Sequence, residues 1–154
     1  VEWRDKVTVP MQSPGYGDCI TRVLYFQLFR TKSLLGIDDL IVYPGAELPV
    51  IQAIKLGAPG CISATANLNG GDISKVINFC HDNEWEKAED LHKKVTKVRL
   101  LFQDYAPIPA QKGLLAKKTK ISAWLNVRPP LKSINDDKVS ELANTLNDEF
   151  GYSY

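Results

Sequence analysis

No stretch of this chain is apolar over the roughly 20 residues that a membrane-spanning helix needs. Residues 1–6 are largely polar and contain no apolar core of a signal peptide. The net charge is only +1, so the chain has no general electrostatic attraction to nucleic acid or to an anionic membrane. These absences predict a cytoplasmic protein that binds neither nucleic acid nor membranes.

Signals for metal binding and for disulfides are also missing. The three cysteines, Cys19, Cys61 and Cys80, lack zinc-ligand spacing, and their odd number favours reduced thiols. His81 and His92 lie in polar sequence without a cysteine or carboxylate partner at ligand spacing, and we interpret both as surface residues. Glycine-rich phosphate loops and hydrolase motifs are absent as well. We therefore expect no metal and no other cofactor.

The composition is that of an ordinary globular domain. The chain has 154 residues, of which 44% are hydrophobic and 24% charged, enough for one core of normal size. Its one dense basic run, residues 117–120, is interpreted as a solvated helix end rather than a phosphate-binding patch.

Apolar patterning predicts that strands and helices alternate in the first half. Strands are expected at residues 7–9, 40–43 and 61–64, and helices at residues 20–35 and 48–56. The small, apolar run 61–64 suits a strand that is buried on both faces, as in a parallel sheet. This alternation implies right-handed crossovers and a ligand site at the carboxyl ends of the strands.

Individual residues refine this expectation. Gly57 should end the helix before it, and Gly60 should permit a close approach of two backbones. We interpret Cys61 as a small buried hydrophobe rather than a nucleophile.

The second half predicts helices only. Residues 69–72 should form a turn, with Asp72 capping a helix over residues 73–80. Asn83 should cap a long helix in a capping box with Glu86.

Proline should then interrupt the helices. Pro107 breaks the long helix, which restarts over residues 108–118. Asn135 should cap a final helix over residues 136–150.

Four short motifs follow one another between about residues 39 and 150. They are Val42-Tyr43-Pro44-Gly45-Ala46-Glu47, Gly57-x-x-Gly60-x-Ile62-Ser63-x-x-x-Asn67, Pro107-Ile108-Pro109 with Lys112, and Val127-Arg128-Pro129-Pro130-Leu131. In this order they resemble the C-terminal portion of the dihydrodipicolinate synthase / N-acetylneuraminate lyase family, the class I pyruvate-type aldolases. The first two motifs are similar to the family's seventh and eighth barrel strands.

The resemblance implies an α/β fold, the C-terminal part of a TIM (β/α)8 barrel. About three parallel strands with their helices would be followed by a C-terminal helical extension. Residues 1–68 would form the partial barrel segment. Residues 69–154 would contain the last barrel helix and the extension.

The resemblance also implies a lyase or aldolase that forms a Schiff base with pyruvate or a related 2-oxo acid. The family carries its lysine four residues before a glycine on the sixth strand. Measured back from Gly15 and Gly17, that position holds Met11 and Ser13. Lys6, the nearest lysine, is interpreted as a surface residue, and the family's proton-shuttle tyrosine has no counterpart. No catalytic residue is therefore assigned, and we expect the chain to be inactive alone.

The substrate-binding residues that the resemblance implies are Ile62, Gly45 and Ser63, which would form the wall of the 2-oxo acid site. Plain packing is an equally good interpretation for Ile62. Glu47 could act as a carboxylate catalyst, although a charge at a helix N-terminus is favoured. Arg128 is expected to pair with a carboxylate of the last helix.

Three parallel strands cannot close a barrel, so they would leave an unpaired edge and an uncovered apolar face. We therefore expect either a piece of a larger barrel or a homo-oligomer that covers the edge. The second case corresponds to an alternative function, a non-catalytic truncated or repurposed homologue that acts as an oligomerising module.

Overall fold

The computed structural model describes residue 34 and residues 40–154 of the chain. The strand expected at residues 7–9 and, apart from residue 34, the helix expected at residues 20–35 lie outside this part. The described helices, in chain order, are α2 (Val50–Lys55), α3 (Ala66–His81), α4 (Trp85–Leu101), η1 (Phe102–Asp104), α5 (Pro107–Thr119), η2 (Ser122–Leu125) and α6 (Asp136–Phe150).

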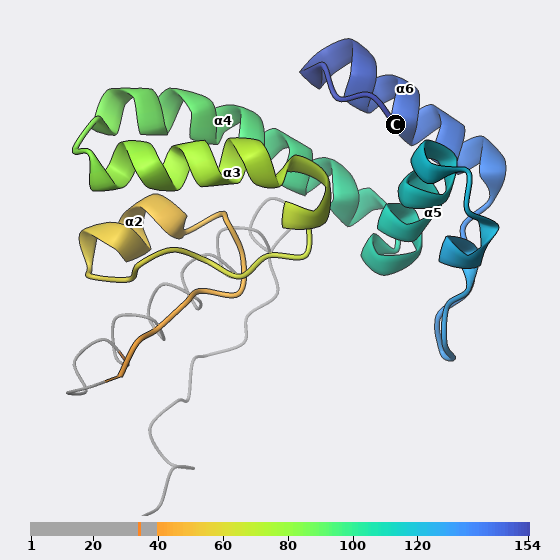
Figure 1. The fold of residues 1–154 in the computed structure, drawn as a ribbon, viewed down its shortest axis with the longest axis horizontal. Coiled ribbons are helices and arrows are strands. Elements are labelled where there is room, and N and C mark those ends of the chain that lie inside the picture. The colour runs from red at the N-terminus through yellow and green to blue at the C-terminus, as the bar shows by residue number, and fades with distance from the viewer. Residues whose placement is uncertain (1–33, 35–39) are drawn as a thin grey trace, which may run out of the picture.

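Two irregular segments, residues 40–44 and 58–63, stand where strands were expected (Figure 1). One backbone hydrogen bond joins them, from the amide of Ile62 to the carbonyl of Pro44 at 3.0 Å. Ile41 is 71% exposed and Ile62 is 70% exposed. Neither segment forms a strand in the described part of the chain, and the burial on both faces that was predicted for residues 61–64 is wrong, because none of these four residues is buried. A parallel strand needs a ladder of hydrogen bonds to its neighbours, and a single bond does not make one.

Helix α2 follows the first of these segments and is shorter than expected. Pro49 is its N-cap, and Gly57 adopts φ = +101° just beyond its end, which confirms the role predicted for this glycine. A Cβ on Gly60 would lie 3.5 Å from Cδ1 of Ile77, an ordinary contact. The close backbone approach expected at Gly60 is therefore not required there.

Helix α3 begins earlier than the sequence predicted. Its N-cap is Thr65, and the glycine-rich residues 69–72 lie inside the helix instead of forming a turn. The helix is nevertheless kinked at the predicted turn, because buried Asn69 has the non-helical angles φ = −116° and ψ = 26°. Asp72 caps nothing and instead contacts residues of other elements.

Helices α3 and α4 pack side by side as a hairpin (Figure 1). The N-cap of α4 is Glu84, whereas Asn83 lies in the connecting turn with φ = +61°, so the predicted capping box is wrong. The helix itself is present as predicted, and its apolar residues Val95 and Val98 are buried. With α2 these helices enclose one hydrophobic cluster, formed by Val50, Ile51, Ile73, Val76, Cys80, Ala88 and Val95.

Helices α5 and α6 confirm the prediction for the end of the chain. Pro107 opens α5 at a position where its missing N–H costs nothing. The side chain of Asn135 caps α6 by accepting a 2.9 Å hydrogen bond from the amide of Asp137. The basic run lies at the C-terminal end of α5, where positive charge suits the helix dipole. A second hydrophobic cluster joins these helices to α4 and comprises Val98, Phe102, Ala110, Leu114, Val139, Leu142, Ala143 and Leu146.

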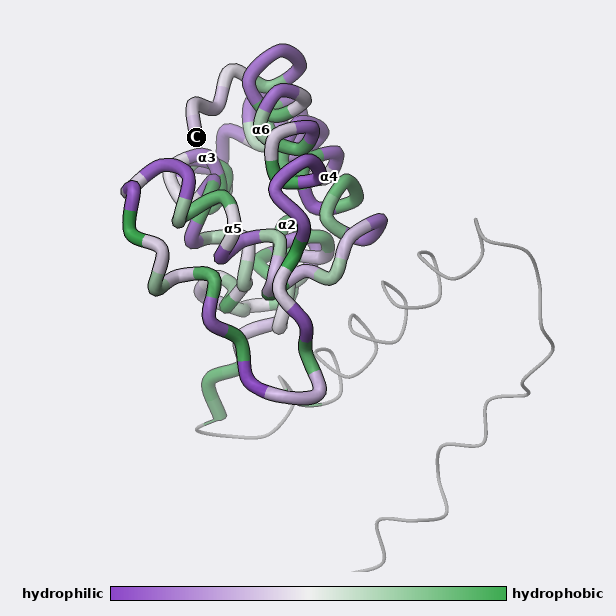
Figure 2. Tube along the Cα trace, turned by 90° about the vertical axis from the view of Figure 1, so that its right-hand side faces the viewer, coloured by the Kyte–Doolittle hydropathy of each residue, from purple (hydrophilic) through white to green (hydrophobic). Residues whose placement is uncertain are grey.

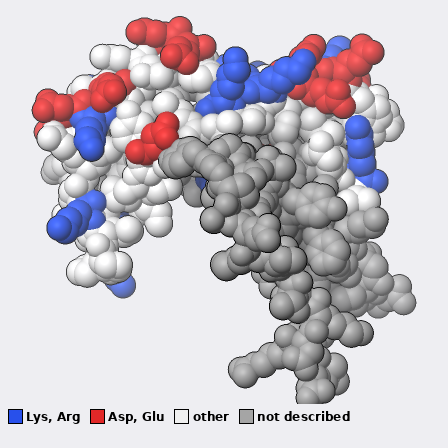
Figure 3. All heavy atoms as spheres, turned by 180° about the vertical axis from the view of Figure 1, so that it is seen from behind, with Lys and Arg blue, Asp and Glu red and all other residues white. Residues whose placement is uncertain are grey.

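Hydrophobic and hydrophilic residues are interspersed along α4 and α6, as expected when one face of a helix packs on a core (Figure 2). Basic and acidic side chains are intermixed along one edge of the molecule and form no large patch of one sign there (Figure 3). Among the helices of the described part, none is both long and apolar enough to cross a membrane.

The last residues, 151–154, form what we term the C-terminal segment, which folds back over α3. Gly151 adopts φ = +71° and its amide donates to the carbonyl of Asn147 at 3.0 Å, as in an αL C-cap, and the amide of Tyr152 donates to the carbonyl of Leu146 at 3.0 Å. The Tyr152 hydroxyl then donates to Oδ2 of Asp72 at 2.5 Å. Nζ of Lys94 lies 3.0 Å from the same oxygen.

The Asp72 carboxylate should make the stability of the chain depend on pH. Burial acts to raise the pKa of Asp72, but hydrogen bonds from Tyr152 and Lys94 and the charges of Lys94 and Lys75 outweigh it and lower that pKa. A lowered folded-state pKa stabilises the fold above the unfolded-state value and ceases to do so as the pH falls through the folded-state pKa. We therefore expect the stability difference between the parent chain and Asp72→Asn to shrink below about pH 4. Urea unfolding at several pH values checks this, and a difference independent of pH would contradict it.

Candidate functional site

A buried carboxylate lies where the two irregular segments end. Glu47 is fully buried in the turn that leads into α2. The Ser63 hydroxyl donates to one of its carboxylate oxygens, and the Thr65 hydroxyl donates to the other. The two hydroxyl oxygens lie 2.9 Å apart. We refer to Glu47, Ser63 and Thr65 as the carboxylate–hydroxyl cluster.

Chain connectivity explains why these side chains meet. Glu47 follows segment 40–44 by three residues, and Ser63 ends segment 58–63. The hydrogen bond between Ile62 and Pro44 holds the two segments together immediately before these residues. Thr65 is the N-cap residue of α3, so the start of that helix is part of the cluster's frame.

The structure brings one of the three predicted binding residues into the cluster. Ser63 is half-buried and bonds Glu47, whereas its neighbour Ile62 projects from the surface. Plain core packing is therefore not the environment of Ile62 in the described part of the chain. Gly45 is exposed two residues before Glu47, and a Cβ there would have no atom within 4 Å. Binding by these three residues stays a prediction.

Two members of the cluster differ from what the sequence predicted. Glu47 is not a charge at the start of α2, because its carboxylate bonds hydroxyl groups and the first turn of α2 has no acidic residue. Thr65 was missed altogether. Its position two residues after Ser63 gave no clear signal, because residues 64 and 65 form a turn and Thr65 has the helical angles φ = −67° and ψ = −16°.

The sequence also predicted the environments of two histidines and one arginine. His92 is half-buried rather than on the surface, with Nε2 2.9 Å from the Glu47 carbonyl oxygen. His81 is exposed as expected, although its Nε2 lies 3.0 Å from the Pro59 carbonyl oxygen. Arg128 is exposed and forms no salt bridge with α6, so that expectation is wrong.

The cluster suits hydrogen bonding and proton exchange rather than metal binding. Its carboxylate accepts from hydroxyl groups that could instead donate to, or accept from, a bound polar molecule. Within residues 40–154, no group of three or more His, Cys, Asp or Glu side chains is placed to hold a metal ion.

Cys61 lies close enough to the cluster to report on its charge. Burial raises the pKa of the Cys61 thiol from the ordinary 9.0 to about 11, and the negative charge of Glu47 adds to this effect. A rise of two units leaves about a hundredfold less reactive thiolate. We expect Cys61 to react slowly with iodoacetamide at pH 8.5. Adding Glu47→Gln should accelerate the reaction only in part, because burial is the larger cause.

The alkylation experiment uses a chain in which Cys19 and Cys80 are replaced by serine, so that mass spectrometry follows Cys61 alone. Glu86→Gln, which removes an exposed carboxylate on α4, is the control and should leave the rate unchanged. An equal rate for the Glu47→Gln chain and the parent would show that Glu47 carries no charge that Cys61 senses.

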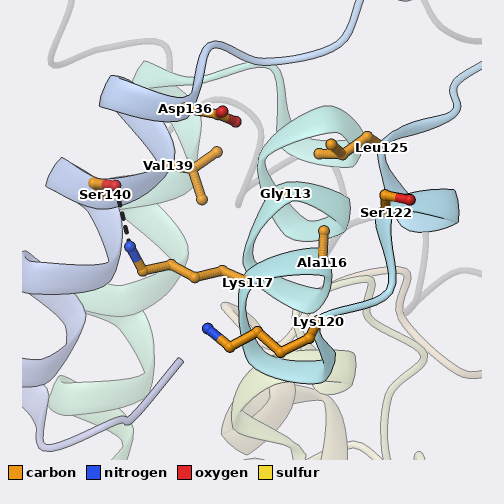
Figure 4. A pocket seen from close by; sticks show the side chains of 9 residues that line it. All are labelled: Gly113, Ala116, Lys117, Lys120, Ser122, Leu125, Asp136, Val139 and Ser140. Carbon is orange, nitrogen blue, oxygen red and sulfur yellow. Dashed lines mark hydrogen bonds between the residues drawn. The ribbon is translucent and has the colours of Figure 1, made fainter.

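A separate hollow of about 410 Å³ lies between α5 and α6 (Figure 4). The Lys117 ammonium on its rim donates to Oγ of Ser140 at 3.1 Å. Lys120 and Asp136 also line it, so its charge is mixed. None of its lining residues belongs to the carboxylate–hydroxyl cluster.

Known proteins are similar to this chain in sequence and in fold over most of its length. The 4-hydroxy-tetrahydrodipicolinate synthase of Methanosarcina mazei is 31% identical over 110 residues, which make up 71% of this chain and 37% of that enzyme. The N-acetylneuraminate lyase of Mycoplasma synoviae matches in structure with a TM-score of 0.70 at 18% identity, over 80% of this chain and 43% of the lyase. The Fusobacterium nucleatum lyase, solved in complex with pyruvate, matches with a TM-score of 0.64 at 20% identity, over 82% and 41%.

These structures define the class: the chain shares its fold with the C-terminal portion of TIM-barrel synthases and lyases. The model of the Dihydrodipicolinate synthetase family matches residues 26–149. The chain therefore belongs to the Dihydrodipicolinate synthetase family, as the four motifs indicated. It spans well under half of the length of the relatives that it matches.

Proposed function

We propose that this chain supplies the C-terminal part of a Schiff-base-forming lyase or aldolase that acts on pyruvate or a related 2-oxo acid. Membership of a lyase family supports the reaction class. The pyruvate complex of the Fusobacterium nucleatum lyase, whose fold is similar, supports the substrate class.

The observation that carries the proposal is the buried carboxylate–hydroxyl cluster. A carboxylate inside a protein is costly unless its oxygens are hydrogen-bonded, and both oxygens of Glu47 accept from hydroxyl groups. Of the other predicted wall residues, Ile62 immediately precedes Ser63 and Gly45 lies two residues before Glu47. In our proposal these residues line the 2-oxo acid site and the cluster orients polar groups of the substrate.

The chain alone should not catalyse the reaction, because the described residues hold no lysine in contact with the cluster. Schiff-base chemistry needs a lysine whose amine is kept neutral by burial or by a neighbouring charge. In the complete enzyme this residue would come from a part of the barrel other than the two irregular segments. The cluster would then act on substrate groups without forming a covalent bond.

Borohydride trapping tests whether the Schiff-base lysine lies outside this chain. We expect no covalent adduct when the isolated chain is incubated with pyruvate and sodium borohydride and its mass is measured. The same chain joined to the first part of a related synthase should be trapped at a lysine of the added part. An adduct on the isolated chain would overturn the claim of inactivity, and a joined chain that folds but never traps would count against the whole proposal.

The exposed apolar edge supports the proposal that the complete fold is a barrel. Ile41, Tyr43 and Ile62 are exposed on the two irregular segments. In our proposal these segments pair with further strands in the complete protein and become two neighbouring strands of a parallel barrel. The third strand, expected at residues 7–9, stays a prediction. The boundary at residue 68 between the barrel segment and the helical extension also stays a prediction.

The same edge favours one alternative function, the non-catalytic oligomerising module. A second copy could cover these apolar residues as well as missing strands could. Sedimentation velocity separates the two cases: an oligomer that dissociates on dilution and becomes monomeric in Ile41→Lys/Ile62→Lys would favour the module. A chain that remains monomeric at high concentration would exclude it.

A further inference from the structure

We propose that the C-terminal segment is a positioning element for the carboxylate–hydroxyl cluster. The side chains of Tyr152 and Tyr154 hold the kinked first turn of α3, and through that turn they hold Thr65 and Ser63 against Glu47. The consequence for substrate binding rests on the function proposed above, whereas the mechanical coupling does not.

The first turn of α3 is a weak point of the helix. Asn69 interrupts the helical angles, so residues 66–68 form a turn separated from the longer part of α3 by the kink. The amides of Leu68 and Asn69 both bond to the carbonyl of Thr65, at 2.8 and 3.0 Å. Any movement of this turn is therefore passed directly to Thr65.

The two tyrosines hold the helix on both sides of the kink. The Tyr154 hydroxyl donates to the carbonyl of Leu68 at 2.9 Å, before the kink, and the Tyr152 hydroxyl donates to Asp72 beyond it. Both tyrosines and Leu68 also pack against the hydrophobic cluster of α4, α5 and α6. The C-terminal segment thus connects the start of α3 to the hydrophobic cluster of α4, α5 and α6, whereas the rest of α3 packs in the cluster of α2, α3 and α4.

Two lysines fix the tyrosine rings from neighbouring helices. Nζ of Lys94 on α4 lies 4.4 Å from the ring centroid of Tyr152 and also forms the salt bridge with Asp72. Nζ of Lys118 on α5 lies 5.0 Å from the ring centroid of Tyr154. These cation–π contacts should orient the hydroxyl groups toward α3.

Residue-resolved hydrogen exchange on the full 154-residue chain, without ligand, tests the coupling. Tyr152→Phe/Tyr154→Phe removes both hydroxyl groups and keeps both rings. We expect the amides of Leu68 and Asn69 to exchange about tenfold faster, the effect of losing roughly one net hydrogen bond. Amides in the second half of α3 should change by less than about twofold, because their hydrogen bonds are untouched.

Tyr105→Phe is the matched control, because Tyr105 packs against the same hydrophobic cluster and its hydroxyl makes no hydrogen bond within the described part. It should leave exchange at Leu68 and Asn69 unchanged. If the double variant does not fold, Tyr154→Phe alone must still show the local effect. Unchanged exchange at the first turn, or equal acceleration along all of α3, would overturn the proposal.

A joined chain that forms the pyruvate adduct provides the second measurement. There the double variant should raise the pyruvate concentration needed for half-maximal trapping and leave the final yield unchanged. If the exchange result holds while trapping is absent in every variant, the positioning role stands and the proposed function fails. If trapping occurs without the exchange effect, the positioning role fails alone.

Discussion

Replacing Glu47 with alanine is expected to destabilise the chain by roughly 1–3 kcal/mol, the cost of leaving a buried donor without its acceptor. Thr65 is fully buried, so its hydroxyl would lose its carboxylate partner and keep only the Ser63 hydroxyl, 2.9 Å away, within reach. Ser63 is only half-buried and can turn toward solvent. Equilibrium urea unfolding gives the change in the free energy of unfolding.

Two comparisons make the Glu47 result specific. Glu47→Gln keeps one acceptor oxygen and most of the volume, so its loss should be smaller than that of Glu47→Ala. Glu86→Ala removes an exposed carboxylate and should change stability by no more than about 0.5 kcal/mol. In a double-mutant cycle, Thr65→Val should cost less in the Glu47→Ala background than in the parent chain.

A stabilising effect of Glu47→Ala would mean that the hydrogen bonds do not offset the cost of burying the carboxylate. The buried carboxylate would then lower the free energy of unfolding of the parent chain. Such an outcome would contradict this prediction and leave the proposed function standing.

How far the sequence predicts this structure depends on how local each signal is. The helix capped by Asn135 and the turn at Gly57 were predicted correctly, because a cap and a left-handed glycine depend on a few neighbouring residues. The capping box at Asn83 failed, although its pattern is equally local, since the chain uses Asn83 in the turn between two packed helices. Tertiary packing overrides such patterns.

The strands and the cluster could not be predicted from local patterns. A buried parallel strand is defined by its neighbours, and Ile62 has the apolar character of such a strand without the neighbours to bury it. The hydrogen bonds of Glu47 join residues 16 and 18 positions apart, and those of the C-terminal segment join residues 80 and 86 positions apart. Only the fold brings such residues together.

Gly113 offers the second large effect, because side chains from α6 and from residue 134 just before it pack against this position of α5. A Cβ on Gly113 would lie 2.6 Å from Cγ2 of Val139 and 2.8 Å from Cγ2 of Ile134, well inside van der Waals contact. Overpacking of this kind typically costs about 1–3 kcal/mol, partly offset by the roughly 1 kcal/mol that alanine gains over glycine in a helix. We therefore expect Gly113→Ala to lower the free energy of unfolding despite its better helix propensity.

The control and the rescue follow from the same contacts. Gly71 lies in α3, where a Cβ would meet no atom within 4 Å, so Gly71→Ala should stabilise the chain by up to about 1 kcal/mol. Val139→Ala removes the nearest methyl group and leaves that of Ile134 in place, so Gly113→Ala should cost less in that background than in the parent chain. Gains of equal size at both glycines would show that α5 and α6 separate without cost, and the packing of this half of the molecule would then be looser than the structure implies.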